Sequence, residues 1–216
     1  MIFPTESLEN LIMDGVADVG KALASPIRLR VIRLLSQSER SVEGLAASLD
    51  ISVANLSQHL QVLKRSGFLN SRRDGRRVYY QVSNRGVMVV SLALAKWAEG
   101  RSDVGSSLYS FMAKSTPISR AELVEGLKVG KITVIDVRHP EEFAVDCVPG
   151  AINIPSHELE RRVGEVPADR DVVICGQGLY SPDASQALSM LSGLKLNLRY
   201  LDGGYMAWCA GVADDA

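Results

Sequence analysis

Cysteine is absent from the first 146 residues, and the whole chain has only three: Cys147, Cys175 and Cys209. This odd, widely spaced set does not suggest a disulfide framework. Histidine is also scarce, since His59 is the only one before His139. A soft-metal site needs several thiolates, and a zinc site needs several imidazoles or carboxylates. We therefore expect no metal site and no cofactor.

Long apolar runs are missing as well. The longest, Val87–Ala95, is too short to span a bilayer. No charged segment followed by an apolar core opens the chain, so we predict no signal peptide, a cytoplasmic protein and no membrane partner. With 216 residues and 46% hydrophobic residues, the chain suits one large domain or two small ones.

The net charge of −1 hides an asymmetry between the two halves. Residues 1–115 hold 15 Lys and Arg against 10 Asp and Glu, whereas residues 116–216 hold 9 against 15. Only the first half is therefore a candidate for binding nucleic acid. Glycine and serine cluster after Glu99, where a short helix over Leu108–Met112 could bridge a linker. We place the boundary near Thr116, which predicts domains 1–115 and 116–216.

Residues 41–82 carry the pattern of a winged helix-turn-helix. After one short helical run, a second run places Val53, Leu56, Leu60 and Leu63 at helical spacing, and we expect all four to face inward. Two strand-like runs then flank Asp74-Gly75, a strong signal for a tight hairpin turn. The alternative is a pair of core helices followed by a solvated hairpin.

The outward face of the second helix is polar without acidic residues, and four arginines flank the hairpin turn. Such side chains can hydrogen-bond to base edges or to phosphates. The order of helix, turn, helix and basic hairpin favours binding to double-stranded operator DNA. The predicted contacts are Ser52, Asn55, Ser57, Gln58, His59, Gln61, Lys64, Arg65, Arg72, Arg73, Arg76, Arg77 and Tyr79.

Residues 22–82 resemble the ArsR-type bacterial repressors in the stretches ALASPIRLRVIRLL, SVEGLAASLDISVANLSQHLQVLKRSGFL and RRDGRRVYYQV. The resemblance implies a homodimer whose interface combines the first helix with the apolar helix after the hairpin. A buried core helix is the alternative for the latter. Members of this family often sense metals through thiolates or His and carboxylate clusters, which the first half of this chain lacks.

From Ile118 onward, strands and helices alternate. The runs Ile132–Val137 and Asp171–Ile174 are continuously apolar, as in buried parallel strands, and Ser119 with Glu122 predicts a capping box. The pieces IDVRHPEEF, VPGAINIP, VVICGQGLYS and LDGGYMAW resemble the rhodanese-like sulfurtransferase domains, in that family's order. We expect an α/β domain with a parallel sheet flanked by helices.

Cys175 ends one of these strands, and the glycine-containing loop after it leads to a helix N-terminus. Backbone N–H groups there could form an anion cradle, lower the pKa of the thiol and make it nucleophilic. The family uses such a cysteine to carry sulfur as a persulfide; an inert buried cysteine is the alternative. The candidate catalytic residues are Cys175, Gly176, Gln177, Gly178, Leu179, Tyr180, Ser181, Arg138 and Cys147.

The loop departs from the family pattern, because Gly176 and Tyr180 stand where active members commonly carry arginine. Missing cations should weaken binding of a dianion such as thiosulfate. Either the sulfane-sulfur or persulfide donor is therefore less charged, or turnover is slow and Cys175 reports rather than catalyses. Arg138 either faces the loop or pairs with Glu141 or Glu142. Cys147 either resolves a modified Cys175 or is structural.

Three functions remain open at this level. The first is a homodimeric repressor that senses reactive sulfur at Cys175. The second is a working sulfurtransferase with an autoregulatory DNA-binding domain. The third and weakest is a metal- or arsenic-responsive repressor that uses all three cysteines, although their sequence contexts do not suggest that they converge.

Overall fold

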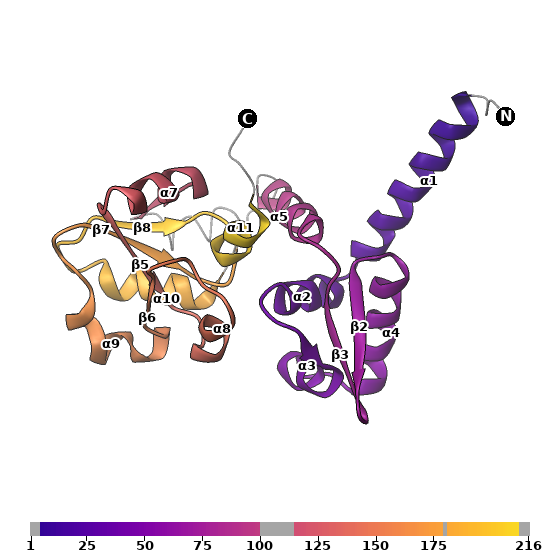
Figure 1. The fold of residues 1–216 in the computed structure, drawn as a ribbon, viewed down its shortest axis with the longest axis horizontal. Coiled ribbons are helices and arrows are strands. Elements are labelled where there is room, and N and C mark those ends of the chain that lie inside the picture. Colours follow the sequence, from indigo (N-terminus) through magenta and orange to yellow (C-terminus); the bar gives the residue numbers. More distant parts are fainter. Residues whose placement is uncertain (1–4, 100–114, 179–180, 212–216) are drawn as a thin grey trace. The chain divides into compact units, whose positions relative to one another are not determined.

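The computed structural model describes residues 5–99, 115–178 and 181–211, whose contacts divide the chain into two compact units, Met1–Val87 and Met88–Ala216 (Figure 1). The bridging helix predicted over 108–112 lies outside the described residues. None of the helices described in these ranges is both long and apolar enough to cross a membrane.

The first unit is mainly helical. Its antiparallel sheet has the strand order β1-β3-β2. Ser41 and Ser52 cap the two helices of the helix-turn-helix by accepting backbone N–H groups, and Asp50 makes the turn between them in the left-handed conformation. The elements are α1 (Thr5–Leu23), α2 (Pro26–Leu35), β1 (Arg40–Ser41), α3 (Val42–Leu49), α4 (Val53–Arg65), β2 (Leu69–Asp74) and β3 (Arg77–Val82).

The core of this unit is built on α2, α3 and α4. Leu56, Leu60 and Leu63 of α4 are all buried, as their helical spacing predicts. The inward placement predicted for Val53 is wrong, since this residue is 44% exposed. Val53 is the first residue of α4, so its side chain lies at the end of the apolar face of the helix, with no preceding helical turn to pack beside it.

The hairpin of β2 and β3 forms the wing. Asp74 pairs with Arg77, so the two turn residues are Gly75 and Arg76, one position later than the predicted Asp74-Gly75 pair. Gly75 has a φ of +58°, a conformation that glycine adopts without the steric cost of a side chain. The wing is thus placed as the sequence indicates, with its turn shifted by one residue.

The second unit is an α/β domain around a parallel sheet with the strand order β4-β8-β7-β5-β6. One face packs against α9 and α10, and the other against α7 and α11. The first strand, β4, was missed in the sequence because it is short and contains proline. The elements are β4 (Thr116–Ile118), α7 (Arg120–Lys128), β5 (Ile132–Asp136), α8 (Pro140–Val145), β6 (Ile152–Asn153), η1 (Ser156–Glu158), α9 (Leu159–Arg162), η2 (Val163–Glu165), β7 (Asp171–Cys175), α10 (Pro182–Leu191), β8 (Leu198–Leu201) and α11 (Gly204–Ala210).

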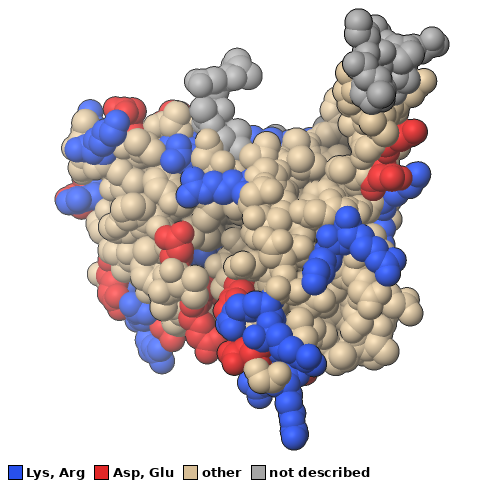
Figure 2. Space-filling view, turned by 45° about the vertical axis from the view of Figure 1, so that its right-hand side comes forward, with Lys and Arg blue, Asp and Glu red and all other residues tan. Residues whose placement is uncertain are grey.

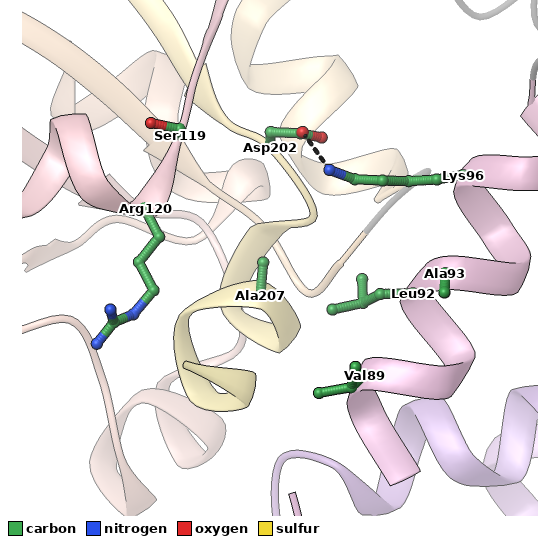
Figure 3. A pocket seen from close by; sticks show the side chains of 8 residues that line it. All are labelled: Val89, Leu92, Ala93, Lys96, Ser119, Arg120, Asp202 and Ala207. Carbon is green, nitrogen blue, oxygen red and sulfur yellow. Dashed lines mark hydrogen bonds and ion pairs between the residues drawn. The ribbon is translucent and has the colours of Figure 1, made fainter. Parts of the chain in front are cut away.

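Helix α5 (Gly86–Glu99) follows the wing, and from Met88 onward it groups with the second unit. Met88 and Leu92 pack against Met206 of α11, and Lys96 forms a 2.8 Å ion pair with Asp202. This ion pair and the apolar side chains of α5 line a small pocket (Figure 3). Other apolar residues of α5 are exposed, so the helix is not the fully buried core helix of the alternative: Val89, Val90, Leu94 and Trp97.

Candidate nucleic-acid interface and cysteine site

Helix α4 presents a polar, exposed face. Asn55, Gln58 and Gln61 are exposed, and His59 is half-buried. The hydroxyl of Ser52 is engaged as a cap, since it accepts the Asn55 N–H at 3.2 Å. The three exposed amide side chains are therefore the best placed to read base edges.

The C-terminal end of α4 is basic and reaches toward the wing. Lys64 donates to the hydroxyl of Ser71 in β2 at 2.7 Å, and Arg65 beside it is exposed. The hydroxyl of Ser57 donates to a backbone carbonyl of its own helix at 2.7 Å. Of the predicted polar contacts, Ser52, Ser57 and Lys64 thus already have protein partners.

The wing arginines fall into two groups. Arg72 donates to both carboxylate oxygens of Glu39, and its guanidinium lies 4.7 Å from the ring centre of Tyr79. Arg73, Arg76 and Arg77 are exposed and make no ion pair within the part of the chain that the structure describes. The wing turn forms the lower tip of the first unit in Figure 1, and basic side chains cover this tip in Figure 2.

Cys175 lies at the carboxyl end of β7, a central strand of the second unit, and is fully buried. Its Sγ donates to the carbonyl of Gly176 over 3.7 Å, a contact that requires the protonated thiol. Burial, followed by the charge of Asp136, raises the pKa of Cys175 well above its ordinary value. The predicted lowering of this pKa is wrong, because loss of hydration, together with the charge of Asp136, outweighs the lowering effect of Arg138.

The loop after Cys175 is fastened to α11. The N–H groups of Tyr205 and Met206 donate to the carbonyls of Gly176 and Gln177 at 2.9 and 3.2 Å. A Cβ on Gly176 would lie 2.5 Å from the Ser181 hydroxyl, so only glycine fits there. The loop conformation thus depends on its glycine and on its backbone bonds to α11.

Other members of the loop have structural contacts or lie outside the description. Ser181 caps α10 by accepting the Ala184 N–H at 3.3 Å, and Gln177 donates to Glu142 at 3.0 Å. Leu179 and Tyr180 are outside the described residues. Asp183, in the first turn of α10, accepts a 2.7 Å hydrogen bond from Ser156, so its carboxylate is already engaged.

Arg138 is buried and pairs with Asp136 through Nε and Nη2 at 2.7 to 3.1 Å. Nη2 also donates to the carbonyl of Asp146, and the guanidinium lies 3.6 Å from the ring centre of Tyr205. Although burial disfavours the charge, hydrogen bonds and the charge of Asp136 raise the pKa of Arg138. The predicted alternative of a pair with a neighbouring glutamate is wrong, because Asp136 is held next to Arg138 by the end of β5.

The other two cysteines, Cys147 and Cys209, are half-buried and form no disulfide within the part of the chain that the structure describes. Burial, with the charges of Asp136 and Asp146, raises the pKa of Cys147. Cys209 packs against the apolar cluster that contains Cys175. No group of three or more His, Cys, Asp or Glu residues in the described ranges could hold a metal ion.

Comparison with known proteins covers both units. The family model of a helix-turn-helix domain matches residues 23–72, and that of a rhodanese-like domain matches residues 119–211. The HTH-type transcriptional regulator Rv0324 of Mycobacterium tuberculosis is 36% identical over 207 residues, which cover 94% of this chain and 92% of the relative. This chain belongs to the ArsR-type transcriptional regulators that carry a rhodanese-like domain.

Two partial relatives resemble one half of this ArsR-type regulator each. A sulfurtransferase of Allochromatium vinosum is 40% identical over 79 residues, 36% of this chain and 71% of the relative. The solution structure of the homodimeric winged helix-turn-helix DNA-binding domain Mb0332 from Mycobacterium bovis is 34% identical and covers 47% of this chain and 93% of that one, with a TM-score of 0.43.

The two domain families, the fold class and the DNA-binding regulator predicted from the sequence are therefore confirmed. The roles of individual site residues stay predictions. Asp136 and Tyr205 were missed as neighbours of Cys175, although the sequence holds a signal for the first. A carboxylate ending an apolar strand must be paired when buried, and an arginine follows two positions later.

Proposed function

We propose that this regulator is a homodimeric repressor that releases its operator when a sulfane sulfur is transferred to Cys175. The observation that carries the proposal is the position of this thiol at the carboxyl end of a parallel strand, directly before a loop that is bonded to α11. Ligands of parallel α/β sheets bind at such strand ends. An operator in the cytoplasm is the DNA partner.

The proposed dimer would use α1 and α5. Both helices expose more apolar side chains than is usual for a helix in contact with solvent. Large exposed apolar faces often mark interaction surfaces. Paired subunits also provide the two half-sites that winged helices usually need for affinity. The exposed apolar residues of α1 are Leu8, Leu11, Ile12, Met13, Val16 and Val19.

A boundary near Thr116 is proposed for the two functional domains. The match to the helix-turn-helix family ends at residue 72, and the match to the rhodanese-like family begins at residue 119. The contacts within the structure divide the chain after Val87. In this division α5 serves the DNA-binding domain as its dimerisation helix, even though its residues from Met88 pack within the second unit.

The second candidate is an active sulfurtransferase, and the likeness to the Allochromatium vinosum sulfurtransferase favours it. Two features oppose fast turnover. Gly176 stands in the loop where active members of the family commonly carry arginine. The resting thiol is also protonated, and a thiol is a weaker nucleophile than a thiolate. A donor with little charge, such as an alkyl persulfide, therefore fits better than thiosulfate.

Gel shifts with the operator, with and without polysulfide, test the proposal when Cys175 is followed by mass spectrometry. The wild type should gain one sulfur on Cys175 and lose operator affinity by roughly 5- to 150-fold, a typical allosteric coupling. Cys175→Ser should bind the operator and ignore polysulfide, and Cys209→Ser should respond as wild type does. Release of DNA by Cys175→Ser would refute the sensor role, and rapid thiosulfate:cyanide turnover would favour the enzyme.

A further inference from the structure

The guanidinium of Arg138 keeps one nitrogen without a partner. Its Nε and Nη2 are engaged by Asp136 and by the carbonyl of Asp146, but Nη1 finds no hydrogen-bond acceptor among the residues the structure describes. Arg138 is 1% exposed, so bulk solvent does not reach the guanidinium. A buried charged donor left unsatisfied is costly, and each such group calls for an explanation.

This guanidinium lies close enough to Cys175 for their charges to interact. Strands β5 and β7 pair Asp136 with Cys175, and residues in register on neighbouring strands point to the same face of a sheet. On that face Arg138 lies between the Asp136 carboxylate and the Tyr205 ring. Tyr205 in turn is bonded through its N–H to Gly176, the residue after the thiol.

We propose that Nη1 of Arg138 is the donor that receives the anionic terminal sulfur of a persulfide on Cys175. The inference rests on the proposed function, in which Cys175 accepts a sulfane sulfur. The ligand of Nη1 is thus the outer sulfur of the persulfide, which carries a single negative charge. The resting thiol is neutral and the carboxylate of Asp136 is already paired with Arg138, so neither of them offers a negative charge to Nη1.

The transfer is balanced for a donor of the persulfide class. Cys175–SH and R–S–S⁻ give Cys175–S–S⁻ and R–SH: a bond forms between the Cys175 sulfur and the donor's outer sulfur, and the donor's S–S bond breaks. The thiol proton leaves with R–SH. A persulfide is a stronger acid than its parent thiol, so the buried site changes from neutral to negative only on modification.

Arg138→Lys is the test variant, because it retains the positive charge for Asp136 but lacks the forked second nitrogen. The readout is the pH dependence of iodoacetamide reaction at the terminal sulfur, measured by mass spectrometry on the full chain after polysulfide treatment. The midpoint should rise by about 1–2 pH units in the variant, the size of one charge-assisted hydrogen bond.

Arg199→Lys is the matched control. Arg199 also donates to a carboxylate, that of Glu122, and its Nε too lacks an acceptor within the described ranges, but it lies on β8 near the sheet edge. Its substitution should leave the midpoint unchanged. Equal midpoints in the wild type and Arg138→Lys would overturn the proposal.

A measurement on the wild type keeps the proposal testable if Arg138→Lys does not fold. The persulfide on Cys175 should titrate at lower pH in the native protein than in the same protein unfolded in guanidinium chloride. A native midpoint at or above the unfolded one would overturn the assignment. If Cys175 gains no sulfur at all, the proposed function fails first, and the two failures are told apart by the mass spectrum.

Discussion

Replacing Gly204 with alanine should loosen the junction between α11 and the Cys175 loop. Gly204 has a φ of +56°, and an added Cβ would lie 2.7 Å from the Gly176 carbonyl oxygen and 2.7 Å from the Gly178 nitrogen. The left-handed conformation alone costs alanine about 1–2 kcal/mol. Overpacking adds about 1–3 kcal/mol, so the second unit should lose about 2–5 kcal/mol.

Gly130→Ala isolates the steric part of this loss. Gly130 has a φ of +69° in the same unit, but nothing lies within 4 Å of its added Cβ. The Gly130→Ala variant should therefore lose only the about 1–2 kcal/mol of stability that the left-handed conformation costs alanine. Urea unfolding of both variants, followed by circular dichroism, measures the difference, and alkylation of Cys175 should be faster in Gly204→Ala. Equal losses in the two variants would refute the close approach of α11 to the loop.

Four further results are expected. Gln58→Ala should cost about 1–3 kcal/mol on the specific operator and much less on random DNA, and equal losses in gel shifts would show that it reads no base. Removing Arg76 and Arg77 together should flatten the slope of log affinity against log salt by about 2, whereas an unchanged slope would place them off the DNA. If Cys147→Ser abolishes the polysulfide response, the endpoint is a bridge to Cys175; a retained response indicates a persulfide on Cys175 alone. Because burial raises the pKa of Cys175 in the folded state, the protonated thiol contributes its full stability below the ordinary thiol pKa of 9.0. Above this pH the free energy of unfolding should fall by about 1.4 kcal/mol per pH unit until the raised pKa is reached. If urea titrations at rising pH give the same dependence for the wild type and Cys175→Ser, this expectation is refuted.

The sequence by itself determined the domain order, the helix-turn-helix and the parallel α/β domain. Each depends on local patterns that tertiary structure did not override. Serine caps begin α3, α4 and α7, and glycine stands at the wing turn where φ is positive. Strands β5 and β7 are rich in β-branched apolar residues and, apart from the half-buried Asp171, are buried on both faces, as is usual for parallel strands.

Only the tertiary structure decided the chemistry around Cys175. The ionisation of a thiol depends on its hydration and on nearby charges, and these come from residues distant in sequence. Strand pairing brings Asp136 beside the thiol, and the packing of α11 brings Tyr205 over Arg138. A motif around the cysteine indicates a nucleophile at the strand end, but burial in the assembled sheet holds the resting thiol protonated, because a buried charge loses its hydration.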